Sequence, residues 1–153
     1  MSKSNVMLHP ILALDVGNGY GKASILTDWT QEPMALLPES LRQGMDTTAY
    51  VAPDGTIEVY PARPRAARAV RAVKSRLEES VIYLEEKGER YQVAPDVVYA
   101  AIVRDLARLA NRELAARKSD GLYDVVLTYP AGFAYRHDLL ARLKRDVESV
   151  YAK

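Results

Sequence analysis

The residues best suited to chemistry lie in one stretch near the N-terminus, LALDVGNGYGKASIL, which runs from Leu12 to Leu26. A carboxylate, Asp15, ends an apolar run, and Gly17, Asn18 and Gly19 follow it. Glycines carry no Cβ to hold a phosphate away from the backbone, and successive N–H groups form a concavity that binds anions. The stretch is therefore either a loop that holds phosphates or an ordinary tight turn.

If the loop holds phosphates, its carboxylate needs a cation. A lone carboxylate beside phosphates is repelled unless a cation lies between them, so Asp15 implies a bound Mg²⁺, held through water. The backbone of Gly17, Asn18, Gly19 and Tyr20 would then bind the phosphates.

The turn hypothesis is equally well founded. Asn18-Gly19 is among the best hairpin turns, because both residues tolerate positive φ. The apolar runs Ile11 to Val16 and Lys22 to Leu26 predict the two strands of that hairpin. Since a strand follows the glycines, they do not open a helix, as a dinucleotide fold requires. The sequence also has no kinase-type catalytic loop and no Walker phosphate loop.

The elements that must position this loop predict an α/β protein. A third strand is expected at Ala35 to Leu37, and a second hairpin over Thr47 to Tyr60, turning at Asp54-Gly55. Apolar residues three or four apart predict a helix from Ala62 to Leu77.

The second half of the chain is expected to be mostly helical. Pro95 opens the strongest predicted helix, which runs to about Lys118. Asp124 to Tyr129 is nearly continuous in apolar residues, which is typical of a strand covered on both faces. A last helix follows, with one apolar face made of Leu139, Leu140, Leu143, Val147 and Val150.

Composition limits the classes of partner. The 153 residues fit one domain or one lobe of a larger one, and 21 basic residues nearly cancel 20 acidic ones. No global field therefore attracts nucleic acid or membrane. No segment approaches the ~18 apolar residues of a membrane helix, and the absence of cysteine suits a reducing compartment. We expect a cytoplasmic protein that binds neither nucleic acid nor membrane.

Four motifs, in order along the chain, resemble the ATPase superfamily of actin, the sugar kinases and the heat-shock chaperones. They are the first phosphate motif at Asp15 to Tyr20, a short sheet around Asp54-Gly55, a lysine-bearing helix at Ala72 to Leu77, and a strand and turn at Val125 to Phe133. The resemblance spans roughly Ile11 to Val150 and is nearest to the DnaK-type chaperones.

The resemblance implies a fold and an activity. The fold is an actin-like, ribonuclease H-like ATPase lobe, a mixed sheet with N-terminal β-hairpins flanked by helices, over residues 1–153. The implied activity is Mg-ATP binding and hydrolysis, with Asp15 and Lys74 as catalytic residues and ATP and Mg²⁺ as cofactors. Protein clients and co-chaperones are the implied partners.

The resemblance also implies a second lobe, which in the superfamily supplies the other phosphate hairpin and the adenosine contacts. We expect that lobe in the parent protein, so the chain is either a fragment or a natural half. By itself it is expected to hydrolyse ATP negligibly.

Departures from the chaperone pattern keep two alternatives open. The chaperones' paired threonines are here Asn18-Gly19, which looks more like plasmid-partition actins, and Tyr129 and Gly132 replace a valine and an aromatic. One alternative is a filament-forming plasmid-partition or cytoskeletal ATPase. The other is a non-enzymatic interaction module, in which the loop is a simple hairpin.

Lys74 also has an alternative interpretation. It is one of six basic residues between Val59 and Leu77, an interval that contains no acid. Such an interval is usually a solvated face and sometimes a nucleic-acid surface.

Overall fold

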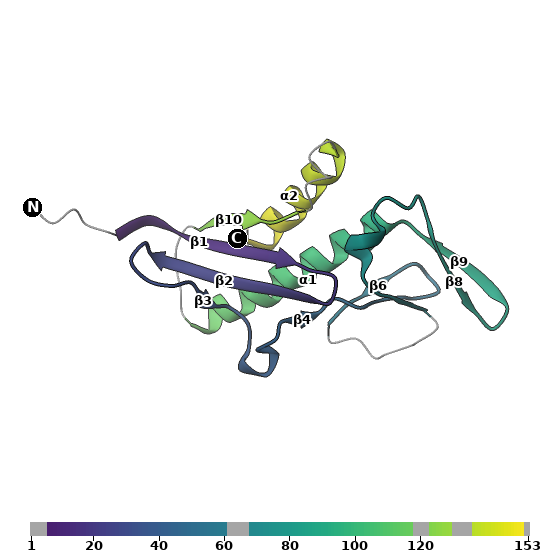
Figure 1. Cartoon of the computed structure of the whole chain (residues 1–153), viewed down its shortest axis with the longest axis horizontal. Helices are drawn as coiled ribbons and strands as arrows, with labels where there is room; N and C mark the ends of the chain where they lie inside the picture. Colours follow the sequence, from purple (N-terminus) through teal and green to yellow (C-terminus); the bar gives the residue numbers. More distant parts are fainter. Residues whose placement is uncertain (1–5, 61–67, 118–122, 130–135, 152–153) are drawn as a thin grey trace, which may run out of the picture.

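The computed structural model describes residues 6–60, 68–117, 123–129 and 136–151, and it is a mixed α/β structure (Figure 1). The strands of its largest sheet are β1 (Val6–Val16), β2 (Tyr20–Asp28), β3 (Met34–Ala35), β4 (Met45–Asp46) and β10 (Asp124–Leu127). Their order is β10-β1-β2-β3, and β4 also pairs with β2. β1 and β2 are antiparallel, whereas β10 runs parallel to β1. The predicted hairpin is therefore confirmed, with longer strands.

One face of this sheet forms the core. Because side chains alternate across a strand, the residues of β1 that face the core are fully buried: Leu12, Leu14 and Val16. Asp15, between them, is exposed on the opposite face. The helix α1 (Pro95–Ala116) packs against the buried face. Leu106 of α1 lies so close that a Cβ added at Gly21 would come within 3.2 Å of its Cδ2 atom.

The two helices lie together. α1 begins at Pro95, as the sequence predicted, and ends at Ala116. α2 (His137–Tyr151) packs against α1, and the Tyr151 hydroxyl donates a 3.0 Å hydrogen bond to the Ala107 carbonyl. Three residues of the predicted apolar face of α2 are buried: Leu139, Leu143 and Val147.

Two smaller sheets lie beyond the glycine loop (Figure 1). One has the order β6-β5-β7, from β5 (Ala49–Val51), β6 (Ile57–Glu58) and β7 (Ala69–Val70). The chain turns at the predicted Asp54-Gly55 between β5 and β6, where Gly55 has a positive φ of +87° and Asp54 does not. The other sheet is a hairpin of β8 (Ile82–Glu86) and β9 (Glu89–Val93).

The sequence did not predict the β8–β9 hairpin. Its turn is Lys87-Gly88, with φ of 52° and 79°, and lysine is an unusual residue at positive φ. The missing signal was the usual Asn-Gly or Asp-Gly turn pair.

The predicted helix from Ala62 to Leu77 is wrong over its described part, and residues 61–67 lie outside the described ranges. Ala69–Val70 is a strand that pairs with β5, and Ala72 has a φ of 50°. Only the short 3-10 helix η3 (Val73–Arg76) is helical between Ala69 and Leu77. Strand pairing has overridden a helical spacing of apolar residues, which local propensity cannot foresee.

Strand β10 also differs from its prediction. It ends at Leu127 rather than Tyr129, and it lies at the edge of the sheet. Val125 and Val126 are 37% and 48% exposed, so the strand is not covered on both faces.

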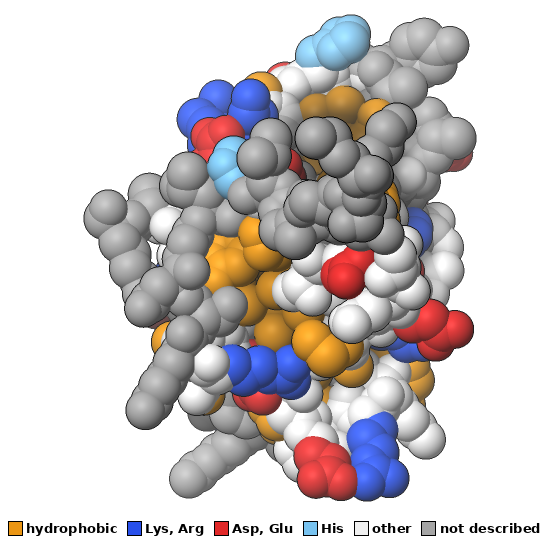
Figure 2. All heavy atoms as spheres, turned by 90° about the vertical axis from the view of Figure 1, so that its left-hand side faces the viewer, with side chains coloured by type: hydrophobic (Ala, Val, Ile, Leu, Met, Phe, Trp, Pro, Cys, Tyr) orange, Lys and Arg blue, Asp and Glu red, His pale blue; other side chains and the backbone are white. Residues whose placement is uncertain are grey.

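Part of the surface is apolar. Figure 2 shows hydrophobic side chains gathered on the end of the molecule that faces the viewer, with charged side chains around them. None of the helices in the described ranges is long and apolar enough to cross a membrane.

Candidate functional site

The glycine loop is a three-residue connection, Gly17 to Gly19, between β1 and β2. The Gly17 N–H donates a 2.9 Å hydrogen bond to the Tyr20 carbonyl and closes the loop. Neither Asn18 nor either glycine has a positive φ. The expected two-residue Asn18-Gly19 turn at positive φ is therefore wrong: the connection has three residues, and none of them has a positive φ.

The two glycines of the loop differ in whether a side chain would fit at their position. A Cβ at Gly17 would lie 3.1 Å from the Tyr20 carbonyl oxygen, a tight contact with backbone. A Cβ at Gly19 would meet no atom within 4 Å. Nothing in the described chain explains the missing side chain at Gly19, and its backbone is open to a ligand.

Asn18 fixes the loop from two sides. Its side-chain Oδ1 accepts a 3.1 Å hydrogen bond from the Ser75 N–H, and its backbone carbonyl accepts one of 3.2 Å from the Thr47 hydroxyl. The Thr47 N–H also donates to the Gly19 carbonyl, at 3.1 Å. Thr47 is only 2% exposed, so the loop rests on a buried support.

Lys74 lies in the turn that Asn18 holds. It is the second residue of η3, half-buried between the buried Val73 and the exposed Ser75. The Arg136 guanidinium reaches the Leu77 carbonyl at 3.5 Å and links the end of this turn to the start of α2. Within the described ranges Lys74 has no ion-pair partner. The structure thus brings the turn of Lys74 to the glycine loop, although 57 positions separate Asn18 from Ser75.

The rest of the basic interval is not a uniform solvated face. Arg68 is 6% exposed and forms an ion pair with Glu86, and its guanidinium lies 4.5 Å above the ring of Tyr91. Arg76 pairs with Glu79 at 2.9 Å.

Asp15 meets a residue that the sequence did not single out. The Thr128 hydroxyl donates a short hydrogen bond to Asp15 Oδ1, and the Thr128 N–H donates to the Leu14 carbonyl at 3.0 Å. Asp15 is the penultimate residue of β1 and Thr128 follows β10, and the carboxyl ends of parallel strands meet at one edge of the sheet. In α/β sheets, ligands bind at this kind of edge. Applied to the sequence, this rule could have identified Thr128 as a candidate site residue.

Asp15 also opens onto a hollow on the face of the sheet opposite α1. The hollow has a volume of about 590 Å³, and Lys22, Ser24 and Arg42 line it with Asp15. Lys22 is the cross-strand neighbour of Asp15. The glycine loop and Lys74 do not line this hollow, so it opens on Asp15 and not on the loop.

A divalent cation at Asp15 would have few protein ligands. The described residues contain no group of three or more His, Cys, Asp or Glu side chains that could hold a metal. Mg²⁺ suits such a site, because it keeps several waters and binds through one or two carboxylates. Asp15 with its hydroxyl partner Thr128 fits Mg²⁺ held largely by water.

The negative charge of Asp15 also affects the pKa of a buried tyrosine. Burial, and secondarily the negative charge of Asp15, raise the pKa of Tyr99 to about 12. Tyr99 is fully buried in the second turn of α1.

The fourth motif of the resemblance is only partly described. Residues 125–129 lie in β10 and just after it, whereas the motif's remaining residues, 130–133, fall outside the described ranges. Compared with protein-family models and with curated proteins, the chain has no match.

Proposed function

We propose that this chain is the Mg-ATP-binding first lobe of an actin-like ATPase, nearest to the DnaK-type chaperones. The observation that carries the proposal is the hydrogen bond from Ser75 N–H to Asn18 Oδ1. It holds the turn of Lys74 beside the glycine loop, and those are the two segments that the resemblance assigns to phosphates.

The arrangement of the sheet supports the same proposal. An antiparallel hairpin carries the glycine loop, and a parallel strand brings Thr128 to the carboxyl end of β1, beside Asp15. These residues come from segments far apart in the chain, yet they gather at one end of the sheet.

Each residue has a role in this proposal. The open backbone at Gly19 would bind phosphate oxygens through N–H groups. Asp15 would hold Mg²⁺ through water, with its side chain oriented by the Thr128 hydroxyl, and the bound ion would offset phosphate charge. The Lys74 ammonium would stabilise the negative charge of the transferred phosphoryl group.

Calorimetric titration with Mg-ATP tests the proposal on this chain. We expect weak binding that needs Mg²⁺, because the proposed contacts reach only the phosphates and the ion. Asp15→Asn should remove the Mg²⁺ dependence. Asp124→Asn is the matched control, because that carboxylate lies at the other end of β10, opposite Ile11, and is also exposed.

The outcomes are distinct. Binding that Asp15→Asn weakens and Asp124→Asn leaves unchanged supports the proposal. If millimolar Mg-ATP gives no binding heat, or both variants behave alike, the loop is only a turn. In the complete protein, ATP-dependent light scattering would favour the filament-forming alternative.

A further inference from the structure

Thr47 lies directly behind the glycine loop, in the connection between β4 and β5, and it is only 2% exposed. Its hydroxyl donates a hydrogen bond to the Asn18 carbonyl at 3.2 Å, and its N–H donates one to the Gly19 carbonyl at 3.1 Å. One buried residue thus holds the carbonyls of two successive peptide groups of the loop. No role for Thr47 was predicted from the sequence.

These two hydrogen bonds determine where the N–H groups of the loop point. A trans peptide group is planar, so its N–H points opposite to its C=O. Because Thr47 holds both carbonyls, the N–H groups of Gly19 and Tyr20 point away from it. Among the described residues the Gly19 N–H has no acceptor, and the Tyr20 N–H does not donate to the Gly17 carbonyl across the hairpin. Successive N–H groups of this kind form a concavity that binds an anion.

The loop needs such a support because of its own glycines. Glycine lets an anion approach the backbone closely, but it also lets the peptide groups beside it rotate. A Cβ at Gly19 would meet no atom within 4 Å, so packing does not restrict this residue. If the peptide group between Asn18 and Gly19 turned over, its carbonyl would replace its N–H and repel an anion. The Thr47 hydroxyl opposes that rotation, because the rotation would break its hydrogen bond.

Thr47 is itself held by its neighbours in the chain. The strand before it, β4, pairs with β2, and Asp46 lies opposite Tyr20 in that pairing. The Asp46 carboxylate accepts a 2.8 Å hydrogen bond from the Thr48 N–H and thereby fixes the turn around Thr47. The support therefore belongs to the same sheet as the loop.

We propose that Thr47 is a positioning residue, which holds the glycine loop ready to bind a chain of phosphates before any ligand is present. This inference rests on the proposed function and adds to it a residue that touches neither phosphate nor metal. The N–H groups of Gly19 and Tyr20 donate to phosphate oxygens on the side of the loop away from Thr47. Thr47 acts only through the direction of those N–H groups.

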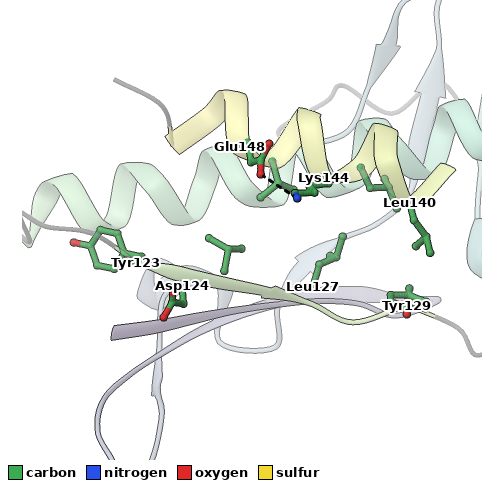
Figure 3. Close-up of a pocket in the computed structure, with 10 residues that line it drawn as sticks. Tyr123, Asp124, Leu127, Tyr129, Leu140, Lys144 and Glu148 are labelled. Atoms are coloured by element: carbon green, nitrogen blue, oxygen red, sulfur yellow. Dashed lines mark ion pairs between the residues drawn. The ribbon is translucent and has the colours of Figure 1, made fainter. Parts of the chain in front are cut away.

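Another opening of the structure provides a control for nonspecific binding. The groove between β10 and α2 is lined in part by Lys144 and Glu148, which pair with each other at 3.8 Å (Figure 3). Neither residues 17–20 nor Thr47 line this groove. Lys144 is exposed, and an exposed positive charge attracts phosphates without a built site. Its removal should not affect binding at the loop.

Two substitutions of Thr47 separate binding from stability. Thr47→Val removes the hydroxyl and keeps a branched side chain of the same shape, so the core stays filled while the Asn18 carbonyl loses its donor. Thr47→Ser keeps the hydroxyl and removes a buried methyl group. If Thr47 positions the loop, phosphate binding weakens in Thr47→Val and is retained in Thr47→Ser. If Thr47 only stabilises the fold, binding follows the melting temperature in both variants.

Calorimetric titration with Mg-ATP, and with sodium tripolyphosphate in the presence of Mg²⁺, measures binding with and without the adenosine group. Thr47→Val should raise the dissociation constant of both ligands about two- to tenfold, which is the equivalent of one hydrogen bond. Thr47→Ser and the control Lys144→Gln should leave both constants unchanged. Thermal melting of each variant provides the comparison with stability.

NMR relaxation of the backbone amides tests the loop without a ligand. In the unmodified chain the Gly19 amide should have an order parameter of about 0.85, that of rigid backbone. In Thr47→Val this order parameter should fall below about 0.6, or the signal should broaden through exchange on the μs–ms timescale. Thr47→Ser should retain the rigid value.

The possible failures are distinct. If Mg-ATP binds and Thr47→Val binds it as tightly, or keeps the Gly19 amide rigid, the positioning role is wrong and the proposed function stands. Losses of binding that follow the melting temperatures, or an equal loss in Lys144→Gln, would also overturn the positioning role. If tripolyphosphate binding depends on the Thr47 hydroxyl but Mg-ATP does not bind, the positioning role is supported and the proposed function fails. If neither ligand binds, both fail.

Discussion

The side-chain oxygen of Asn18 accepts a hydrogen bond from the backbone N–H of Ser75, and this one contact joins the glycine loop to the turn of Lys74. The sequence predicted a different role for Asn18, as a turn residue that tolerates positive φ. In the structure its φ is not positive, and its side chain is a bridge between two segments.

Removing that bridge should loosen both segments. Asn18→Ala deletes the acceptor, so the free energy of unfolding should fall by about 0.5–1.5 kcal/mol. Amide hydrogen exchange at Ser75, followed by NMR, should become faster. Asn18→Asp retains an acceptor oxygen and should keep exchange at Ser75 slow. Unchanged exchange in Asn18→Ala would mean that the hydrogen bond does not persist in solution.

Two glycines should respond differently to alanine. Gly19→Ala should leave stability within about 0.5 kcal/mol of the unmodified chain, because its Cβ meets nothing. If the loop binds phosphates, that variant should still bind Mg-ATP more weakly. Gly44→Ala should be severely destabilised, because Gly44 has a φ of +112° and its Cβ would lie 2.7 Å from the Gly21 carbonyl oxygen. Thermal melting beside calorimetric titration measures both effects.

The part-buried ion pair of Arg68 and Glu86 should be costly to break from one side. Glu86→Gln leaves the buried Arg68 guanidinium without its carboxylate, which should lower the free energy of unfolding by about 1.5–3 kcal/mol. The double variant Arg68→Met with Glu86→Gln removes both charges and should recover most of that loss. Chemical denaturation tests this, and a double variant no more stable than Glu86→Gln would contradict it.

Tyr99 should make the fold sensitive to alkali. Its pKa is raised from 10.0 to about 12, so the folded state holds the phenolic proton between these values while the unfolded state releases it. The titration of Tyr99 therefore leaves the free energy of unfolding unchanged below pH 10. Above pH 10 it lowers the free energy of unfolding by up to about 1.4 kcal/mol per pH unit. Tyr99→Phe should flatten this part of the stability–pH profile. A profile as steep as that of the unmodified chain would assign the alkaline loss to other groups.

If a second lobe completes the proposed ATPase in the parent protein, Lys74→Ala should there separate catalysis from nucleotide binding. A charge used mainly in the transition state appears in kcat, so turnover should fall by about 100-fold or more while nucleotide affinity changes little. Steady-state ATPase assays beside nucleotide titration measure the two quantities. An unchanged kcat would mean that Lys74 has no catalytic role and is a structural or solvent-exposed residue.

The sequence by itself determined the elements whose signals are local. The β1–β2 hairpin, the turn at Asp54-Gly55, the helix that begins at Pro95 and the apolar face of α2 all lie where their patterns predicted them. Each depends on residues within a few positions of one another, so propensity and periodicity are sufficient.

Only the tertiary structure decided the rest. Ala69–Val70 is a strand because β5 is available to pair with it, and β10 is exposed because of its place at the edge of the sheet. The contact of Asp15 with Thr128 spans 113 positions, and no local pattern encodes it. The physical reason is that these contacts form only when separate elements pack. The local sequence around each residue does not encode which distant residue packing will bring to it.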